Sequence, residues 1–483
     1  LPKLNLPDKE LDKFKRECAE ICGMLAMGLL QGAVIEDLIK IEPLMAEFDE
    51  LVKQRDTLKP KPEEVNAKLK HLFDNRLKPA VLKWMAEMQG INEVIKPDNV
   101  FICDGSSSRI IRAALLVSAM INSPEPKAKP SKKAVLVFGR SWDGFKKIVP
   151  QEMYYTDIID GSVSAESLES FIRAEVLGLD VGEPFDITEA RKVVKQGVGA
   201  LILNIPENPI GKIPSEQEMQ ALAQVIAKYD IPAVISDEIF AVPNFKSIST
   251  YPDMASRTYV TSSTSKVIPF EHTLSFGYSH NSVFAKALSL LVNKDQQVVD
   301  GPVSVGFSTI LESLDASYYE GNQCLYATNR RLINDEMDSI NNKVQLSEGI
   351  GWLIEPNYGC LGVLTFPREL TDKAEIISSV QLCEYIYKTC AVATLPSGDV
   401  NPNPNEPVGV RINFSGPPEM VVGAIKRLEF AILSIKEGIK YSDIAGDKLH
   451  GEAQPELAAE TKLREMLANA LGQGDEGKAK VVA

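Results

Sequence analysis

The chain has 483 residues, of which 44% are hydrophobic and 24% are charged, and its formal net charge is −14 at pH 7. This composition is typical of a globular protein, and the length suits a large domain joined to a smaller one. The acidic balance argues against nucleic acid or an anionic membrane surface as a partner, and no apolar run approaches the roughly 18 residues that cross a bilayer.

The cysteine and histidine content excludes two further classes. The seven cysteines are odd in number and scattered, which is typical of reduced thiols in a cytoplasmic protein and not of a disulfide framework. Only four histidines occur, and none is paired with a cysteine cluster at metal-ligand spacing. The sequence therefore predicts a cytoplasmic protein without a metal site.

In chain order, the predicted elements begin with helices. Apolar residues recur at near-helical spacing between residues 8 and 55, and a proline-containing break follows at residues 57–63. From residue 100 to 280, strands alternate with helices, which predicts a doubly wound, mostly parallel sheet. Short strands return from residues 344–346 onward among further helices, which predicts a smaller α+β domain.

The first strand of this sheet is followed by a turn rich in small polar residues. Residues 100–103 read as a strand and are followed by Asp104, Gly105, Ser106 and Ser107 before a helix. Glycine permits a tight turn, and serine amides and hydroxyls at a helix N-terminus form an anion site. The alternative is an ordinary cluster of N-capping residues.

Two apolar strands downstream also end in polar side chains. One ends at Asn204 and runs into a turn that carries Asn208, and the other ends in Asp237 and Glu238. A carboxylate at the end of a buried parallel strand points toward the crevice where α/β proteins bind ligands, and it could keep a pyridine ring nitrogen protonated. Taken singly, each stretch could equally be an ordinary junction between a strand and a turn.

The next strand ends in a hydroxyl cluster followed by a lysine. Residues 259–261 are β-branched or aromatic, residues 262–265 are all serine or threonine, and Lys266 follows at once. One interpretation is a surface lysine, since lysines are almost never buried unpaired. The other is a Schiff-base lysine, whose amine condenses with an aldehyde cofactor while the hydroxyls bind a phosphate.

Four short motifs together resemble class I/II aminotransferases. Residues 204–211 resemble the family's AsnProxAsnProThrGly turn, residues 236–240 its AspGluxTyr, residues 262–266 its SerxSerLys, and residues 410–414 its ArgIlexPhe. In this order the motifs are typical of fold type I pyridoxal-phosphate enzymes, and the resemblance covers about residues 75–440. It implies a seven-stranded type of sheet in the large domain.

The resemblance implies a role for each motif. Lys266 would hold pyridoxal 5′-phosphate and move the substrate's α-proton, Asp237 would pair with the ring nitrogen, and Arg411 would bind a substrate carboxylate. Asn208 would donate to the ring oxygen and also line the substrate site, while Trp142 would stack on the ring. The full set of implied cofactor contacts is Gly105, Ser106, Ser107, Trp142, Asn208, Asp237, Phe240, Ser263, Ser265 and Lys266.

Two positions depart from the family pattern. Phe240 stands where the family has a tyrosine, so the ring oxygen would lack a phenol donor. Leu274 stands eight residues after Lys266, where the family usually has an arginine directed at the phosphate, and no arginine lies between Lys266 and Gly277. Either the phosphate is held mostly by neutral donors, or the cofactor affinity is reduced. The alternative is that the register differs by one residue and that Arg109 or an arginine of another subunit takes this role.

The predicted organisation is an N-terminal helical segment (1–75), a large pyridoxal-phosphate-binding domain (76–320), a small C-terminal domain (321–440) and a polar tail (441–483). The predicted function is a pyridoxal-phosphate-dependent enzyme acting on an α-amino acid, with aminotransferase as the first choice and a 2-oxo acid as a possible second substrate. The alternatives are a related lyase, decarboxylase or synthase, and a catalytically weak relative with a binding role. The resemblance also implies a homodimer, whose partners include neither nucleic acid nor a membrane.

Overall fold

The computed structural model describes fourteen stretches of the chain, and it divides into two compact units. The first unit takes residues up to 139, 143–206 and 213–320, and the second takes 140–142, 207–212 and the residues from 321 onward. The predicted N-terminal helices lie outside the described residues, as does the tail beyond residue 445. The described stretches are 76–89, 95–121, 132–138, 142, 144–158, 163–208, 211–242, 245–266, 273–294, 301–314, 316–345, 351–353, 359–397 and 408–445.

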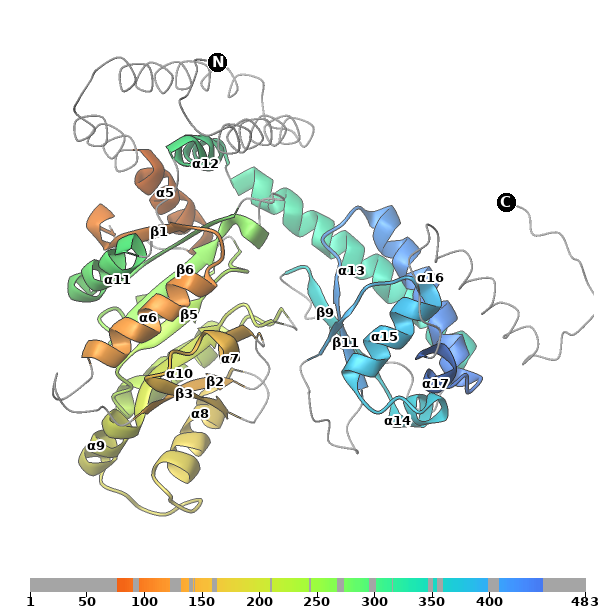
Figure 1. Cartoon of the computed structure of the whole chain (residues 1–483), viewed down its shortest axis with the longest axis horizontal. Coiled ribbons are helices and arrows are strands. Elements are labelled where there is room, and N and C mark those ends of the chain that lie inside the picture. Colours follow the sequence, from red (N-terminus) through yellow and green to blue (C-terminus); the bar gives the residue numbers. More distant parts are fainter. Residues whose placement is uncertain are drawn as a thin grey trace, which may run out of the picture. The chain divides into compact units, whose positions relative to one another are not determined.

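The first unit is built on a seven-stranded sheet with the strand order β1-β7-β6-β5-β4-β2-β3 (Figure 1). Only β7 runs antiparallel to its neighbours, β1 and β6, so the sheet is mostly parallel, as predicted. The strands are β1 (Val100–Asp104), β2 (Lys133–Phe138), β3 (Met153–Ile158), β4 (Val198–Asn204), β5 (Val234–Asp237), β6 (Thr258–Ser263) and β7 (Leu274–Tyr278).

Helices cover both faces of this sheet, and the residues of its central strands are buried throughout. All seven residues of β4 are buried, as expected for a parallel strand packed on both sides. The helices of this unit are α5 (Lys78–Gln89), α6 (Ser108–Ile121), α7 (Gly144–Ile148), α8 (Ala165–Phe171), α9 (Ile187–Gly197), α10 (Glu216–Lys228), α11 (Ser282–Lys294) and α12 (Gly301–Ser313). Shorter turns are η2 (Pro97–Asn99), η3 (Ile172–Val176), η4 (Ile248–Thr250) and η5 (Thr264–Lys266).

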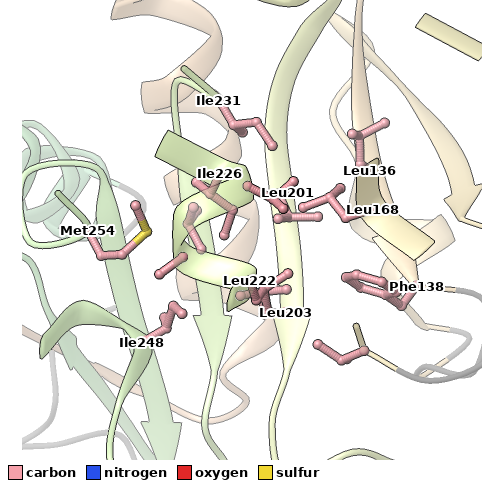
Figure 2. Packing of buried hydrophobic residues seen from close by; sticks show 14 of the residues in the cluster. Leu136, Phe138, Leu168, Leu201, Leu203, Leu222, Ile226, Ile231, Ile248 and Met254 are labelled. Carbon is pink, nitrogen blue, oxygen red and sulfur yellow. The ribbon is translucent and has the colours of Figure 1, made fainter. Parts of the chain in front are cut away.

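Alternate residues of β4 pack against different helices, because successive strand side chains point to opposite faces. Leu201 and Leu203 join a buried cluster with Leu222 and Ile226 of α10, and Figure 2 shows these four side chains close together. Ala200 and Ile202 belong instead to the cluster that contains residues of α6 and α11. A third cluster joins α5 and α12 to β1, β6 and β7.

The second unit is a smaller α+β structure, which confirms the predicted fold class. Its antiparallel sheet has the order β10-β11-β9-β8, with β8 (Gly351–Leu353), β9 (Leu361–Phe366), β10 (Leu395–Pro396) and β11 (Val408–Asn413). Its helices are α14 (Arg368–Thr371), η6 (Asp372–Ala374), α15 (Ser379–Cys390), α16 (Pro418–Lys436), α17 (Tyr441–Ala445) and the part of α13 (Ala316–Val344) beyond residue 320.

The strand predicted at residues 344–346 is wrong. Helix α13 continues to Val344, because Ile333, Met337, Ile340 and Val344 recur at helical spacing and are all buried in the core of the second unit. Val344, the first residue of the predicted strand, is therefore the last residue of a long helix.

Gly277 on β7 sits where no side chain fits. A Cβ atom there would overlap the carbonyl oxygen of Val260 on β6 and the ring of Phe101 on β1. We expect Gly277→Ala to lower the free energy of unfolding by about 1–3 kcal/mol, the usual cost of forcing extra atoms into a packed interior. Urea denaturation measures the change, and Gly197→Ala is the control, because no atom lies within 4 Å of a Cβ at that position. Equal stability of the two variants would contradict the prediction.

Candidate functional site

Lys266 lies at the end of a short turn that leaves the sheet. Strand β6 ends at Ser263, and the turn η5 carries the chain from the buried Thr264 to the exposed Lys266. The hydroxyl of Thr264 fixes this turn to β7, since its Oγ1 accepts a hydrogen bond from the amide of Leu274 at 3.0 Å. The Nζ atom of Lys266 lies 5.8 Å from the centre of the Phe240 ring.

Asp237 lies at the carboxyl end of the neighbouring strand β5. Its side chain is buried, and burial raises its pKa to about 7, while the backbone amide of Ile239 and the charge of Lys266 act in the opposite direction. Among the described residues, its Oδ1 atom has no hydrogen-bond partner. A buried acceptor without a donor costs about 1–3 kcal/mol, so this oxygen is suited to accept a hydrogen bond from a ligand.

The end of β4 is fastened to the end of β5 beside this carboxyl. The side-chain amide of Asn204 donates to the carbonyl oxygen of Asp237 at 3.2 Å, and the backbone amide of Ile205 donates to the same oxygen at 3.1 Å. These two bonds hold the backbone from which the Asp237 side chain projects. They also fix where the chain leaves β4 for the turn that carries Asn208.

Glu238 belongs to a second buried polar group that the sequence did not predict. Its Oε1 atom accepts hydrogen bonds from the hydroxyls of Ser236 at 2.8 Å and Ser247 at 2.6 Å, and Ser249 links Ser247 to Tyr278. Burial raises the pKa of Glu238 to about 8, so the carboxyl keeps its proton at neutral pH. Ser236 is two residues before Glu238 and Ser247 is nine residues after it. No pattern in the sequence indicated that these serines would bind the Glu238 carboxyl.

The loop after β1 gathers hydroxyl groups at the start of a long helix. Gly105 has a φ of 85°, a conformation that glycine adopts without strain. The Ser106 hydroxyl accepts hydrogen bonds from the amide and the hydroxyl of Ser108, at 3.3 and 3.0 Å, and α6 begins at Ser108. With the buried Ser107 between them, these residues form the type of helix N-terminus that binds anions.

Strand β7 joins this loop to the end of β6. The amide of Gly105 donates to the carbonyl oxygen of Thr273 at 2.7 Å, and the hydroxyl of Ser275 donates to the carbonyl oxygen of Gly105. Ser275 is paired with Cys103 on β1 and with Ser263 on β6. The amide of Ser265 donates to the Ser263 hydroxyl at 3.2 Å. The pairing therefore brings the Gly105 loop to the same edge of the sheet as Lys266.

Leu274, eight residues after Lys266, does not face the Gly105 loop. The Leu274 side chain is fully buried in an apolar cluster with Trp84 and Phe276. Since side chains alternate along a strand, it is the next residue, Ser275, that faces the Gly105 loop. A polar hydroxyl, not an apolar side chain, therefore faces the Gly105 loop from β7.

Three of the sequence-predicted site residues belong to the second unit. Asn208 is buried, and its Oδ1 atom accepts a hydrogen bond of 2.7 Å from Nη1 of Arg411, a residue on β11. These side chains are 203 residues apart in the chain. Trp142, whose side chain is 39% exposed, also belongs to this unit.

The described residues contain no group of three or more histidine, cysteine, aspartate or glutamate side chains that could hold a metal ion. Within the same residues, no helix combines the length and apolar character that crossing a membrane requires.

The sheet order, the lysine after β6 and the acid at the end of β5 are features of the fold type I architecture. They place this chain in that class of proteins. The family model for aminotransferase class I and II matches residues 184–428, which is more than half of the sequence. The chain belongs to this family.

Individual relatives are distant. A Petunia hybrida protein, bifunctional aspartate aminotransferase and glutamate/aspartate-prephenate aminotransferase, is 24% identical over 370 residues, which cover 74% of this chain and 69% of the relative. Kynurenine–oxoglutarate transaminase 3 of Bos taurus is 40% identical over only 73 residues, 14% of this chain and 16% of that protein.

Solved structures show the same fold. N-succinyldiaminopimelate aminotransferase from Mycobacterium tuberculosis superposes with a TM-score of 0.54 at 18% identity, covering 74% of this chain and 83% of that one. Aspartate aminotransferase from Rhizobium meliloti gives a TM-score of 0.55 at 15% identity, covering 74% and 81%.

The raised pKa of Glu238 predicts a pH-dependent stability. The folded protein keeps this proton up to about pH 8, whereas the unfolded chain loses it near 4.5, so the free energy of unfolding falls as the pH rises between these values. We expect Glu238→Gln to make this fall shallower, by at most about 1.4 kcal/mol per pH unit, the limit for one proton.

Urea unfolding of the cofactor-free protein at pH 5, 6, 7 and 8 measures this slope. The control is Glu166→Gln, a change to an exposed side chain on α8, which should leave the slope as it is in the unmutated protein. An unaltered slope in Glu238→Gln would show that this carboxyl does not titrate differently in the folded and unfolded states.

Proposed function

We propose that the protein is a pyridoxal-phosphate-dependent aminotransferase that moves an amino group from an α-amino acid to a 2-oxo acid. The observation that carries this proposal is the pair formed by Lys266 and Asp237 at the ends of adjacent parallel strands. Membership of the aminotransferase family and the names of the relatives support transamination as the reaction. The substrates and the assembly of this chain are proposals.

The residues of the first unit fit the cofactor. Asp237 offers a buried oxygen that lacks a donor among the described residues, which suits the protonated nitrogen of a pyridine ring. When bound, pyridoxal 5′-phosphate supplies an aldehyde and a ring that accepts the electron pair released at the substrate's Cα. Asp237 would hold the proton at the ring nitrogen, because a carboxylate beside it favours the charged form.

Lys266 would have two tasks. Its amine would hold the cofactor covalently, and after displacement by the substrate amine it would take the proton from the substrate's Cα and return it at another atom. The exposed position of Lys266 at the end of η5 is consistent with a side chain that alternates between these tasks. The phosphate would be held by the loop hydroxyls and amides of Gly105, Ser106, Ser107, Ser263 and Ser265.

The second unit would supply the substrate contacts. A guanidinium binds a carboxylate through two parallel hydrogen bonds, so Arg411 is the candidate for the substrate's α-carboxylate. Its bond to Asn208 holds the guanidinium in place, and Asn208 would also contact the ring oxygen. Trp142 and Phe240 would contribute aromatic contacts to the cofactor ring.

A second class of reaction is favoured by one observation. Phe240 offers no phenol donor to the ring oxygen, and Lys266 lies over its ring instead. A related lyase, decarboxylase or synthase of the same fold is therefore the alternative. Product analysis separates them: a transaminase forms a new amino acid from the 2-oxo acid, whereas a lyase or decarboxylase releases a fragment of its single substrate.

The proposal also includes an oligomeric state and a cellular compartment. A homodimer in the cytoplasm is the state we propose, since fold type I sites lie between subunits and most soluble oligomers are symmetric dimers. Light scattering at several dilutions tests the dimer, and a fully active monomer would contradict it.

The covalent assignment is testable by trapping. After incubation with pyridoxal 5′-phosphate and reduction with borohydride, we expect mass spectrometry of a digest to find the adduct on the peptide that contains Lys266. Lys266→Ala should abolish the adduct, and Lys286→Ala, a change on α11, should leave it intact. An adduct on any other lysine would remove Lys266 from this role.

The sequence also predicts the preferred substrate. No arginine occurs between Lys266 and Gln323, the stretch in which related specialists for dicarboxylic amino acids carry a second arginine, and lysine binds a carboxylate only as a point charge. We expect neutral or aromatic amino acids to give a higher kcat/KM than aspartate or glutamate. A panel of amino-acid donors with a fixed 2-oxo acid measures this, and a clear preference for aspartate or glutamate would overturn it.

A further inference from the structure

We propose that Arg109, at the start of α6, supplies the positive charge for the cofactor phosphate in place of the arginine that is missing after Lys266. The inference rests on the proposed function, because it concerns how this chain holds pyridoxal 5′-phosphate. The family pattern places the phosphate's charged partner after Lys266, near β7. In this chain the charged partner would instead be on α6.

The guanidinium of Arg109 lies directly against the loop. Its Nη1 atom donates a hydrogen bond of 3.0 Å to the carbonyl oxygen of Asp104, and a Cβ atom at Gly105 would lie 3.5 Å from the guanidinium carbon. The charge is therefore held beside the loop residues whose amides and hydroxyls face the start of α6.

Most N–H donors of this guanidinium are available to a ligand. Arginine carries five N–H donors in its side chain, and within the part of the chain that the structure describes the Arg109 guanidinium makes one hydrogen bond and no ion pair. Its side chain is exposed, so binding an anion would not require the loss of a buried ion pair.

Strand β7 supplies no such charge. Leu274 points into the apolar core, and the Ser275 hydroxyl already donates to the carbonyl oxygen of Gly105. Neither lysine nor arginine occurs in residues 273–281. A dianionic phosphate at the Gly105 loop would meet only neutral donors from this side.

The neighbouring arginine on the same helix has a different contact. Nη1 of Arg112 donates to the carbonyl oxygen of Ile148 at 3.2 Å, and Ile148 ends α7. Arg112 is three residues along α6 and equally exposed, so it matches Arg109 in charge and exposure but not in its contact with the loop. It therefore serves as the control position.

The test compares two ligands that differ only in the phosphate group. Cofactor-free protein is titrated with pyridoxal 5′-phosphate and, separately, with pyridoxal, and binding is followed by absorbance. Because hydrogen bonds to charged groups contribute about 1.5–3 kcal/mol, we expect Arg109→Ala to weaken binding of the phosphorylated ligand about tenfold to hundredfold. Its affinity for pyridoxal should not change.

Two further variants sharpen the result. Arg109→Lys keeps the charge but not the planar donors, so its affinity for pyridoxal 5′-phosphate should fall between those of the unmutated protein and Arg109→Ala. Arg112→Ala should bind both ligands as the unmutated protein does. If Arg109→Ala fails to fold by circular dichroism, Arg109→Gln replaces it, since glutamine keeps a polar side chain with N–H donors but removes the positive charge.

The possible outcomes separate the two proposals. A loss confined to the phosphorylated ligand and to Arg109 variants supports the inference. Full affinity in Arg109→Ala, or an equal loss in Arg112→Ala, overturns it while the proposed function stands. If the unmutated protein binds neither ligand, the proposed function fails, and the inference fails with it.

Discussion

The antiparallel strand β7 is the constraint on which the site depends. It forms hydrogen bonds with β1 on one side and β6 on the other, so the ends of two strands that are distant in sequence are held at one edge of the sheet. The Gly105 loop follows the first of these strands, and Lys266 follows the second. A shift of one residue in either pairing would exchange the faces to which Ser275 and Leu274 point, because strand side chains alternate between faces.

Removal from water determines the protonation of the two carboxyl groups at the end of β5. Asp237 and Glu238 are adjacent and both buried, and burial raises the pKa of each carboxyl group. Their surroundings differ: two serine hydroxyls donate to one oxygen of Glu238, and its other oxygen, like Oδ1 of Asp237, has no donor among the described residues. What distinguishes Asp237 is the nearby charge of Lys266, which places this carboxyl beside the candidate site.

The candidate site residues that the sequence could name are those that lie in local motifs. Lys266, Asp237, Asn208 and Arg411 each stand in a short motif, and the alternation of apolar strands and amphipathic helices predicted the parallel sheet. It did not reveal which residue of β7 faces the Gly105 loop, because counting residues across the connection from Lys266 does not determine on which face a strand resumes.

Side-chain contacts were likewise not predictable from motifs. The bonds that Glu238 accepts from Ser236 and Ser247 depend on the fold. The sequence left Arg109 as one of several candidates for the phosphate, and only the structure shows its guanidinium against Gly105. The strand predicted at residues 344–346 overlaps the end of α13 at Val344, because four apolar positions at helical spacing, from Ile333 to Val344, carry the helix that far.

The bond between Asn208 and Arg411 has a consequence for how the chain is made. Asn208 lies in a six-residue excursion that leaves the first unit and belongs to the second, and its partner is 203 residues further along the chain. At a synthesis rate of about 5–20 residues per second, Asn208 is added to the chain roughly 10–40 seconds before Arg411. During that interval the sheet of the first unit can assemble while this turn still lacks its partner, so the second unit is completed only late in translation and cannot be obtained whole as a contiguous fragment.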